Sequence, residues 1–386
     1  MDKKINRRLF LKNSAAVAAG LTLNQYLGTG SEMPAVKNPL PRWKGFNLLD
    51  FFTPDPPGEH SSSTTTEDDF KWMAGWGFDF VRIPIAYPRY LDFDRKRDIT
   101  KDEVCNFDNK VLDEIDRLVF MAHKYNLHVS LNLHRGPGYC INAGFHEPFN
   151  LWKDKDAGDA FNAHWKMWAE RYRSITSEKL SFDLLNEPAY IENMNDQYAK
   201  KGPVPGDIYK SVATGACAVI RSVSPDRLII ADGNGGGNSV IPELKELKVG
   251  QSCRAYFPGL VSHYRAEWVW KDPSKAPMPV WPGNIDGKYY GRQTLEDFYK
   301  PWIDLVSQGT GVHCGEGGCY NKTPHDVFLS WFGDVLDILT RNSIGYALWN
   351  FRGSFGIIDS GRVDVNYTDW YGHKLDSKLL ELLKKY

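Results

Sequence analysis

The chain has 386 residues, of which 42% are hydrophobic and 13% aromatic, and its formal net charge is −1. A chain of this kind can bury a large core, and it lacks the basic excess that favours nucleic-acid binding. We therefore expect a soluble globular enzyme and no nucleic-acid partner. The 13 Trp and 19 Tyr residues are many for such a chain, and a minority are expected to stack on the apolar faces of sugars.

The first residues are expected to be a targeting signal outside the fold. Arg7 and Arg8 precede a run of small, mildly apolar residues at positions 14–21. This order is typical of a twin-arginine export signal, and an ordinary secretory signal is the alternative. The apolar run is shorter than the ~20 residues that span a membrane. We predict that residues 1–30 direct export to the periplasm or the extracellular space, with no membrane span.

Six cysteines follow, at positions 105, 140, 217, 253, 314 and 319, without the Cys-x-x-Cys spacing of a metal site. Buried free thiols are the favoured interpretation, and disulfides stay open as the alternative in an exported protein. No metal or other cofactor is predicted.

Short apolar runs alternate with amphipathic segments from residue 40 to residue 386. The clearest helical period lies in residues 108–125, and further helices are expected at 66–75, 160–174, 208–223, 295–308 and 326–341. Alternation of this kind favours a parallel sheet with right-handed crossovers, and eight repeats close it into a single-domain (β/α)8 barrel of the α/β class. The eight expected strands are 44–48, 78–83, 127–133, 180–185, 228–231, 260–263, 311–314 and 344–349.

The fourth expected strand ends in polar residues. Residues 181–188 read Ser-Phe-Asp-Leu-Leu-Asn-Glu-Pro, so an apolar run stops where an amide, a carboxylate and a proline follow. Because the active site of such barrels lies at the carboxyl ends of the strands, Glu187 is the first catalytic candidate. The alternative is a helix start, with Asn186 as the cap and Pro188 in the first turn.

A second glutamate ends the seventh expected strand. Residues 311–318 read Gly-Val-His-Cys-Gly-Glu-Gly-Gly, which places Glu316 among glycines that admit close approach of a ligand. Two glutamates at strand ends suggest a catalytic pair.

With these two motifs the chain resembles glycoside hydrolase family 5, the cellulase family of retaining (β/α)8 glycosidases. That family has its acid/base in Asn-Glu-Pro after strand 4 and its nucleophile in a Gly-Glu element after strand 7. The resemblance implies that Glu187 is the acid/base and Glu316 the nucleophile. Retaining enzymes hold these carboxyl groups about 5 Å apart.

The resemblance also assigns roles to other residues at strand ends. Arg82 would keep Glu316 ionised, because a neighbouring positive charge lowers a carboxylate pKa, and a structural ion pair at the barrel rim is the alternative. Asn186 would bond the 2-hydroxyl of the sugar, and Trp349 would form the platform beneath that sugar.

His134 and His263 match histidines that contact the first sugar and hold the catalytic carboxylates in the family. One position departs from the pattern. Family members usually have a tyrosine two residues after the strand-6 histidine, where it bonds the nucleophile, but this chain has Arg265 there. Either Tyr264, shifted by a local bulge, takes this place, or another group replaces the tyrosine.

The resemblance implies a β-linked polysaccharide or oligosaccharide as the substrate. We prefer endo-acting cleavage of β-1,4-glucan, with β-mannanase or exo-acting β-glucosidase activity as alternatives. Residues 271–290 are expected to form a functional loop, and Arg352 and Asp359 would close one end of a cleft. The loop aromatics expected to line that cleft are Tyr139, Trp152, Trp268, Trp270, Trp281 and Phe351.

Two other classes of protein are ranked lower. A metallohydrolase barrel is disfavoured because the chain has no His-x-His or His-Glu-x-x-His element. A non-catalytic sugar-binding barrel would have no reason to hold both glutamates and Arg82. We expect a monomeric glycosidase.

Overall fold

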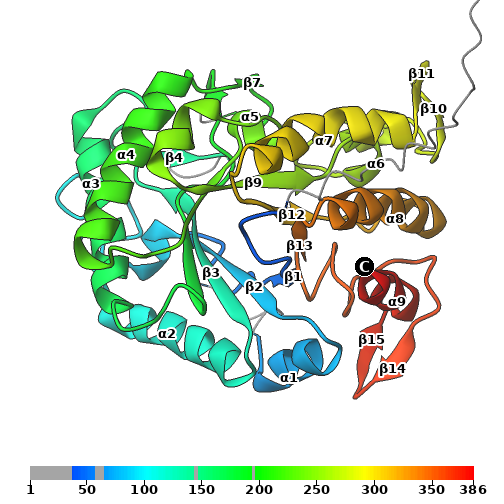
Figure 1. Ribbon diagram of the computed structural model, residues 1–386, viewed down its shortest axis with the longest axis horizontal. Coiled ribbons are helices and arrows are strands. Elements are labelled where there is room, and N and C mark those ends of the chain that lie inside the picture. Colours follow the sequence, from blue (N-terminus) through cyan, green and yellow to red (C-terminus); the bar gives the residue numbers. More distant parts are fainter. Residues whose placement is uncertain (1–36, 57–64, 143–146, 194–195) are drawn as a thin grey trace, which may run out of the picture. The chain divides into compact units, whose positions relative to one another are not determined.

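Eight parallel strands close into a barrel in the order β2-β1-β13-β12-β9-β8-β5-β3, and β3 pairs back with β2 (Figure 1). Almost every residue of these strands is buried, as expected of a parallel sheet that helices cover on the outside. The strands are β1 (Lys44–Asn47), β2 (Phe80–Ala86), β3 (His128–Gly136), β5 (Leu180–Asp183), β8 (Ile229–Asp232), β9 (Gly250–Ala255), β12 (Val312–Gly317) and β13 (Gly345–Leu348).

The computed structural model describes residues 37–56, 65–142, 147–193 and 196–386. They belong to one compact unit that extends from Val36 to Tyr386. The export signal predicted for residues 1–30 lies outside the described residues. Among those described, no helix combines the length and the apolar character needed to cross a membrane.

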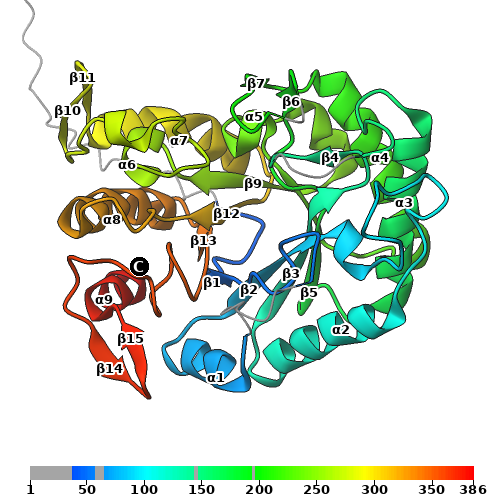
Figure 2. The ribbon, with the colours of Figure 1, turned by 180° about the vertical axis from the view of Figure 1, so that it is seen from behind.

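The long helices lie between the barrel strands in the sequence and outside them in space (Figures 1 and 2). Each of the predicted helices is confirmed, with shifts of a few residues at the ends. The helices are α1 (Glu67–Gly75), α2 (Asn109–Lys124), α3 (Lys155–Arg171), α4 (Gly206–Val223), α7 (Arg292–Ser307), α8 (His325–Arg341) and α9 (Ser377–Lys385), with short turns α5 (Asn234–Gly237), α6 (Gly259–Ser262), η1 (Tyr87–Tyr90), η2 (Pro242–Leu247) and η3 (Pro273–Lys275).

Small antiparallel pairs decorate the barrel. Strand β4 (Tyr139–Cys140) folds back on the end of β3, and β6 (Tyr190–Ile191) pairs with β7 (Lys201–Gly202). The predicted loop at 271–290 contains the whole hairpin of β10 (Gly283–Ile285) and β11 (Lys288–Tyr290). A second hairpin, of β14 (Thr368–Trp370) and β15 (His373–Leu375), precedes α9.

The prediction of a strand at 260–263 is wrong. That segment contains the short helix α6, and the sixth barrel strand is β9, about ten residues earlier in the chain. β9 escaped detection because its sequence, Gly-Gln-Ser-Cys-Arg-Ala, is polar although all six residues are buried. Its polar groups are satisfied internally: Gln251 Nε2 donates to the Ile241 carbonyl at 2.7 Å, and Ile241 N donates to Gln251 Oε1 at 2.9 Å.

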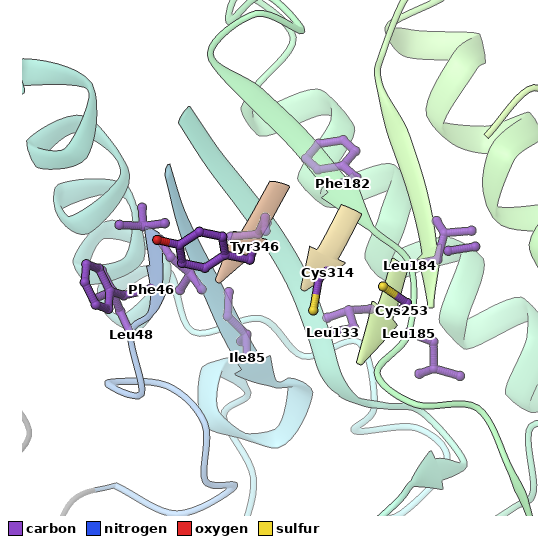
Figure 3. Close-up of a cluster of buried hydrophobic side chains, with 14 of the residues drawn as sticks. Phe46, Leu48, Ile85, Leu133, Phe182, Leu184, Leu185, Cys253, Cys314 and Tyr346 are labelled. Carbon is purple, nitrogen blue, oxygen red and sulfur yellow. The ribbon is translucent and has the colours of Figure 1, made fainter. Parts of the chain in front are cut away.

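The buried cluster inside the unit includes two cysteines from neighbouring strands. Cys253 of β9 and Cys314 of β12 are register partners, and Figure 3 shows them with aliphatic side chains such as Leu133 and Leu184. All six cysteines are free, and Cys105 alone among them is exposed. This agrees with the favoured interpretation of buried thiols.

Candidate active site

Glu187 lies just after β5, in a backbone conformation that side chains rarely adopt. Its φ is 48°, in the left-handed region. Two contacts hold the backbone there: Glu187 N donates to Asp232 Oδ2 at 3.0 Å, and the Tyr139 hydroxyl donates to the Glu187 carbonyl at 2.7 Å. Strain of this kind persists only where the surroundings fix it, and it is concentrated at functional sites. The alternative of a helix beginning at Pro188 is wrong, because no helix starts there.

Glu316 is buried near the carboxyl end of β12, where the pairing of the strand is irregular. The register with β9 shifts between Cys314 and Glu316, and a local shift of this kind re-aims a side chain. Gly315 allows the close approach of β9 at this point. A Cβ atom on Gly315 would lie 2.5 Å from Ser252 Oγ.

Arg82 of β2 is buried and lies at the centre of the polar network. Its Nη1 donates to Glu316 Oε1 at 2.6 Å, and its Nε donates to Asp183 Oδ2 at 2.7 Å. The predicted neighbourhood of Arg82 and Glu316 is therefore present in the structure. The other acceptors around this guanidinium are Asn47 Oδ1 at 3.1 Å, Asn186 Oδ1 at 2.9 Å and Asp232 Oδ2 at 3.3 Å.

A second buried arginine, Arg254 of β9, was not predicted from the sequence. Its Nε donates to Glu187 Oε1 at 2.9 Å, and its Nη2 lies 3.3 Å from Glu316 Oε1. One guanidinium thus contacts both glutamates. The available signal was an arginine in a short polar segment with a tyrosine two residues later, but that segment did not resemble a buried strand.

Asp232, at the end of β8, connects the two arginines. It is fully buried and accepts from Arg254 Nη1 at 3.1 Å, with Arg254 Nη2 also in contact. Burial alone would raise the pKa of Asp232, but Arg254 and Arg82 outweigh it and hold that pKa below the ordinary value. Asp232 therefore balances part of the positive charge in the network.

Glu187 has the opposite electrostatic environment. Burial, followed by the negative charge of Glu316, raises the pKa of Glu187 to about 7, although Arg254 opposes the shift. Its side chain keeps 17% of its surface exposed, whereas that of Glu316 keeps 4%. Glu187 can therefore carry and exchange a proton near neutral pH.

Tyr256, two residues after Arg254, holds the other side of Glu316. Its hydroxyl donates to Glu316 Oε2 at 3.2 Å. This corrects the choice of Tyr264, which is buried with the Arg265 guanidinium 5.1 Å from its ring centroid. The error arose because residues 260–263 were predicted as the sixth strand in place of β9. The end of β9 has Arg254 where the family pattern has histidine. Tyr256 then keeps the expected spacing of two residues.

His263 approaches the site from α6, not from a strand end. Its ring centroid lies 5.0 Å from that of Tyr256, and Ser262 Oγ lies 2.8 Å from His263 Nδ1. Burial lowers the pKa of His263 to about 4, so the ring is neutral near pH 7.

His134, in β3, and Trp349, just after β13, lie next to each other. Their ring centroids are 5.6 Å apart, and the ring of Phe52 contacts both. Burial and the nearby Arg82 lower the pKa of His134 well below its ordinary value. An uncharged His134 ring and the Trp349 ring could both contact a bound sugar. The roles predicted for the two residues stay predictions.

Asn186 is oriented by both arginines. Its Oδ1 accepts from Arg82 Nη2 at 2.9 Å and from Arg254 Nη2 at 3.0 Å. Its Nδ2 is buried, and no partner is found for it among the described residues. A buried amide donor without a partner fits the predicted bond to a sugar hydroxyl.

Most of the aromatics predicted to line a cleft are buried in the fold instead. Tyr139, Trp152, Trp281 and Phe351 are buried, and Trp281 Nε1 donates to Asp334 Oδ2 at 2.9 Å. Trp268 is the clear exception, with 42% of its surface exposed. In the described ranges, no group of three or more His, Cys, Asp or Glu residues is arranged to hold a metal ion.

A barrel with two glutamates at its carboxyl end, both in contact with arginine, has the pair of carboxyl groups that a glycoside hydrolase needs. The profile of the cellulase family, glycosyl hydrolase family 5, matches residues 35–354. The chain belongs to this family.

Several relatives are similar along most of their length. Endoglucanase C of Acetivibrio thermocellus is 25% identical over 335 residues, which cover 80% of this chain and 90% of the relative. Cellodextrinase A of Ruminococcus flavefaciens is 24% identical over 321 residues, or 78% and 83% of the two chains.

Solved structures agree on the fold. A crystal structure of a glycoside hydrolase is 38% identical, covers 89% of this chain and 99% of its own, and superposes with a TM-score of 0.78. The endoglucanase Cel5A from the hyperthermophilic Thermotoga maritima is 22% identical, with coverage of 88% and 96% and a TM-score of 0.66. The predicted (β/α)8 barrel is confirmed.

Proposed function

We propose that the protein is an endo-acting β-1,4-glucanase in which Glu316 is the nucleophile and Glu187 the acid/base. The observation that carries the assignment is that Arg254 contacts both carboxylates, which brings the two glutamates to one site. The division of roles follows their surroundings: Glu316 is held by Arg82 and Tyr256, whereas Glu187 has a raised pKa.

In the first step Glu316 attacks the anomeric carbon of the sugar, and the bond from that carbon to the leaving oxygen breaks. Glu187 gives its proton to the leaving oxygen, so a free sugar hydroxyl departs and a glycosyl ester forms on Glu316. Arg82 and Tyr256 orient the attacking carboxylate through its two oxygens. Water then attacks the same carbon, loses a proton to Glu187 and releases Glu316 as a carboxylate.

The same residue serves as acid and then as base because its pKa depends on the other glutamate. The charge of Glu316 contributes to the raised pKa of Glu187 in the free enzyme. That charge is neutralised in the ester, so the pKa of Glu187 falls and the group can accept a proton from water.

Asn186, Trp349, His134 and His263 are proposed as contacts to the sugar next to the cleaved bond. The unpartnered Nδ2 of Asn186 supports a hydrogen bond to the 2-hydroxyl, a contact that strengthens in the transition state. The half-buried ring of Trp349 supports stacking on the sugar face.

The preference for β-1,4-glucan is supported by the relatives named endoglucanase and cellodextrinase. Its test is a panel of barley β-glucan, carboxymethylcellulose, xyloglucan, β-mannan and aryl β-glycosides. We expect the highest kcat/KM on the glucans, with a rapid fall in viscosity at few reducing ends. A faster reaction on mannan, or release of glucose alone without loss of viscosity, would overturn the substrate or the endo mode.

Export is a separate proposal, supported by the Arg7-Arg8 segment and the small-residue run after it. Fractionation of the natural host, followed by N-terminal sequencing, tests it. We expect protein that lacks the first residues in the exported fraction. Full-length protein found solely in the cytoplasm would contradict the proposal.

A further inference from the structure

A pocket of about 490 Å³ lies between α1, the segment after β13 and the β14–β15 hairpin. Its volume falls within the roughly 300–1,000 Å³ of typical ligand pockets. It shares no residue with the network around Glu187 and Glu316. The residues of its lining that could contact a ligand are Asp68, Trp72, Arg352, Asp359, Tyr371 and His373.

The residue at the tip of this hairpin is unusual for its turn. Tyr371 and Gly372, the two residues between β14 and β15, have φ of 53° and 84°. Two-residue hairpin turns with positive φ at both positions favour Asn-Gly or Asp-Gly. The β10–β11 hairpin follows that rule, since its loop residues Asp286 and Gly287 have φ of 51° and 77°.

The ring of Tyr371 contacts two tryptophans, and it meets the ring of Trp370 edge to face with centroids 5.4 Å apart. The ring of Tyr371 lies nearly parallel to that of Trp72, with centroids 5.8 Å apart. Even so, Tyr371 is 78% exposed, so the contact buries little apolar surface. A bulky residue kept at positive φ, with its ring in solvent, indicates a function for that ring.

The polar groups beside the ring are fixed in place. Arg352 Nη2 donates to the buried Asp69 at 2.6 Å, and its Nη1 donates to Asp359 Oδ2 at 3.0 Å. His373 Nδ1 lies 2.9 Å from the same Asp359 oxygen, and Lys374 N donates to Asp359 Oδ1 at 2.9 Å. A rigid carboxylate next to an exposed aromatic ring is the combination that accepts hydrogen bonds from hydroxyl groups while a sugar stacks on the ring.

The charges indicate which sugars fit. The lining carries two carboxylates, Asp68 and Asp359, against one guanidinium, Arg352, which Asp359 shares with the buried Asp69. Uronic acids would be repelled by the remaining negative charge, whereas neutral hexoses would not.

Two residues of the pocket lining lie on the side of the barrel that carries the glutamates. Asp68 is in the first turn of α1, which follows the connection from β1, and Arg352 follows β13. Connections of this type are on the carboxyl side of a (β/α)8 barrel, the side that carries the active site.

We propose that this pocket is a second glycan-binding site, which holds a neutral β-glycan chain through Tyr371 and Asp359 away from the cleaved bond. The proposal rests on the proposed glucanase function for the identity of the chain it retains.

The test is affinity electrophoresis in native gels that contain barley β-glucan, β-mannan or polygalacturonate. All proteins carry Glu316→Gln, so that the glycan in the gel is not degraded. Tyr371→Asn is the test variant, because asparagine suits the turn and removes the ring without destabilising the hairpin. Tyr289→Asn is the matched control, since Tyr289 lies in the other hairpin and is 60% exposed.

We expect retardation by a neutral glycan and none by polygalacturonate, with affinity reduced about fivefold or more by Tyr371→Asn. The control should bind as the parent does, and the melting temperature of Tyr371→Asn should be unchanged or higher. In the active protein, Tyr371→Asn should raise KM for the polymer and leave the hydrolysis of aryl β-cellobioside unchanged.

Equal retardation of Tyr371→Asn and the parent would overturn the proposal, as would equal losses in Tyr371→Asn and the control. This outcome is distinct from failure of the proposed function. If the active protein hydrolyses no glucan, the glucanase proposal fails, while the gels still report whether Tyr371 binds glycan.

Discussion

The two glutamates have different partners and different proposed roles, so their variants should lose activity on different substrates. Glu187→Gln removes the proton donor, which contributes typically about 10²- to 10⁴-fold when the leaving group needs a proton. An activated aryl glycoside needs none, so this variant should still form the glycosyl ester on it and fail on oligosaccharides. Glu316→Gln should fail on both. Pre-steady-state kinetics on the two substrates measures the split.

The location of the covalent sugar decides the assignment. Mass spectrometry of the trapped intermediate should find the sugar on Glu316, and it should accumulate in Glu187→Gln because an amide cannot activate water. A sugar attached to Glu187 would reverse the roles of the two glutamates, and a product of inverted anomeric configuration would exclude the double displacement.

Arg254 tunes the acid/base and can be tested through the pH profile. Its charge opposes the rise in the pKa of Glu187. Arg254→His, with a neutral ring, should raise that pKa further, so the basic limb of kcat/KM should move above its position near pH 7. We expect kcat to fall at the same time, because Glu316 loses a partner. Arg254→Lys is the control: it keeps the charge, so its basic limb should stay near that of the parent.

A fall in kcat without any movement of the basic limb would show that Arg254 acts on structure alone. Circular dichroism of the variants separates this result from loss of the fold.

At the scale of single elements, the irregular pairing of β12 is what places Glu316. Gly315 lies in it, and an added Cβ would meet Ser252 Oγ at 2.5 Å and Arg254 Nη1 at 3.3 Å. Gly315→Ala should therefore push β9 and its arginine away and reduce kcat by at least about tenfold, since small displacements of catalytic groups are costly.

A second substitution, at Ser252, tests whether this clash is the cause. Ser252→Ala removes the oxygen in the way, so the double variant Gly315→Ala/Ser252→Ala should recover part of the lost kcat. Gly75→Ala, at a position where a Cβ meets nothing within 4 Å, should leave kcat unchanged. If the double variant is no better than the single one, the clash is not the cause.

Seven of the eight barrel strands were predictable, because each lies in a short segment that contains apolar residues and alternates with helical segments. β9 could not be found this way, because its residues are polar although they are buried. Their hydrogen bonds are made with residues outside the strand, such as Ile241. Residues 260–263 were preferred because an apolar run ending in histidine matched the family pattern. Because the sixth strand was misplaced, Tyr264 was expected to contact the nucleophile, whereas Tyr256 does so in the structure.

The site was predictable where a residue lies in a recognisable strand, as Arg82 does, or just after one, as Asn186 and Glu187 do. Exposure was harder to predict. Trp152 and Trp281 lie in loops, yet their indole nitrogens donate to Ala189 and Asp334 inside the fold. Only long-range contacts distinguish such residues from aromatics that face a ligand.

At the scale of the whole molecule, buried carboxyl groups should make stability depend on pH. Burial raises the pKa of Glu147 from 4.5 to about 7, although Tyr87 donates to Glu147 Oε2 at 2.6 Å. A raised carboxyl pKa favours the folded state at low pH, and this contribution is lost as pH rises from about 4.5 to about 7. We expect the free energy of unfolding to fall over this window by up to about 3 kcal/mol from Glu147 alone.

Urea unfolding at pH 5 and at pH 8 measures this difference. Glu147→Gln is neutral at both values and should reduce it. Glu103→Gln is a suitable control, because Arg97 and Thr100 lower the pKa of Glu103 to about 2, so its carboxylate stays ionised at both pH values. An equal pH difference in Glu147→Gln and the parent would contradict the expectation.

Arg82 and Arg254 share Asp232, Asn186 and Glu316 as partners, and these residues come from strands all around the barrel. Substitutions in this network should therefore be epistatic, with effects that do not add. Histidine at position 254 should be better tolerated once Asp232 is also made neutral, because the positive and the negative charge of this buried ion pair are then removed together. An evolutionary path between this network and the usual histidine of the family thus requires coordinated changes on β8 and β9.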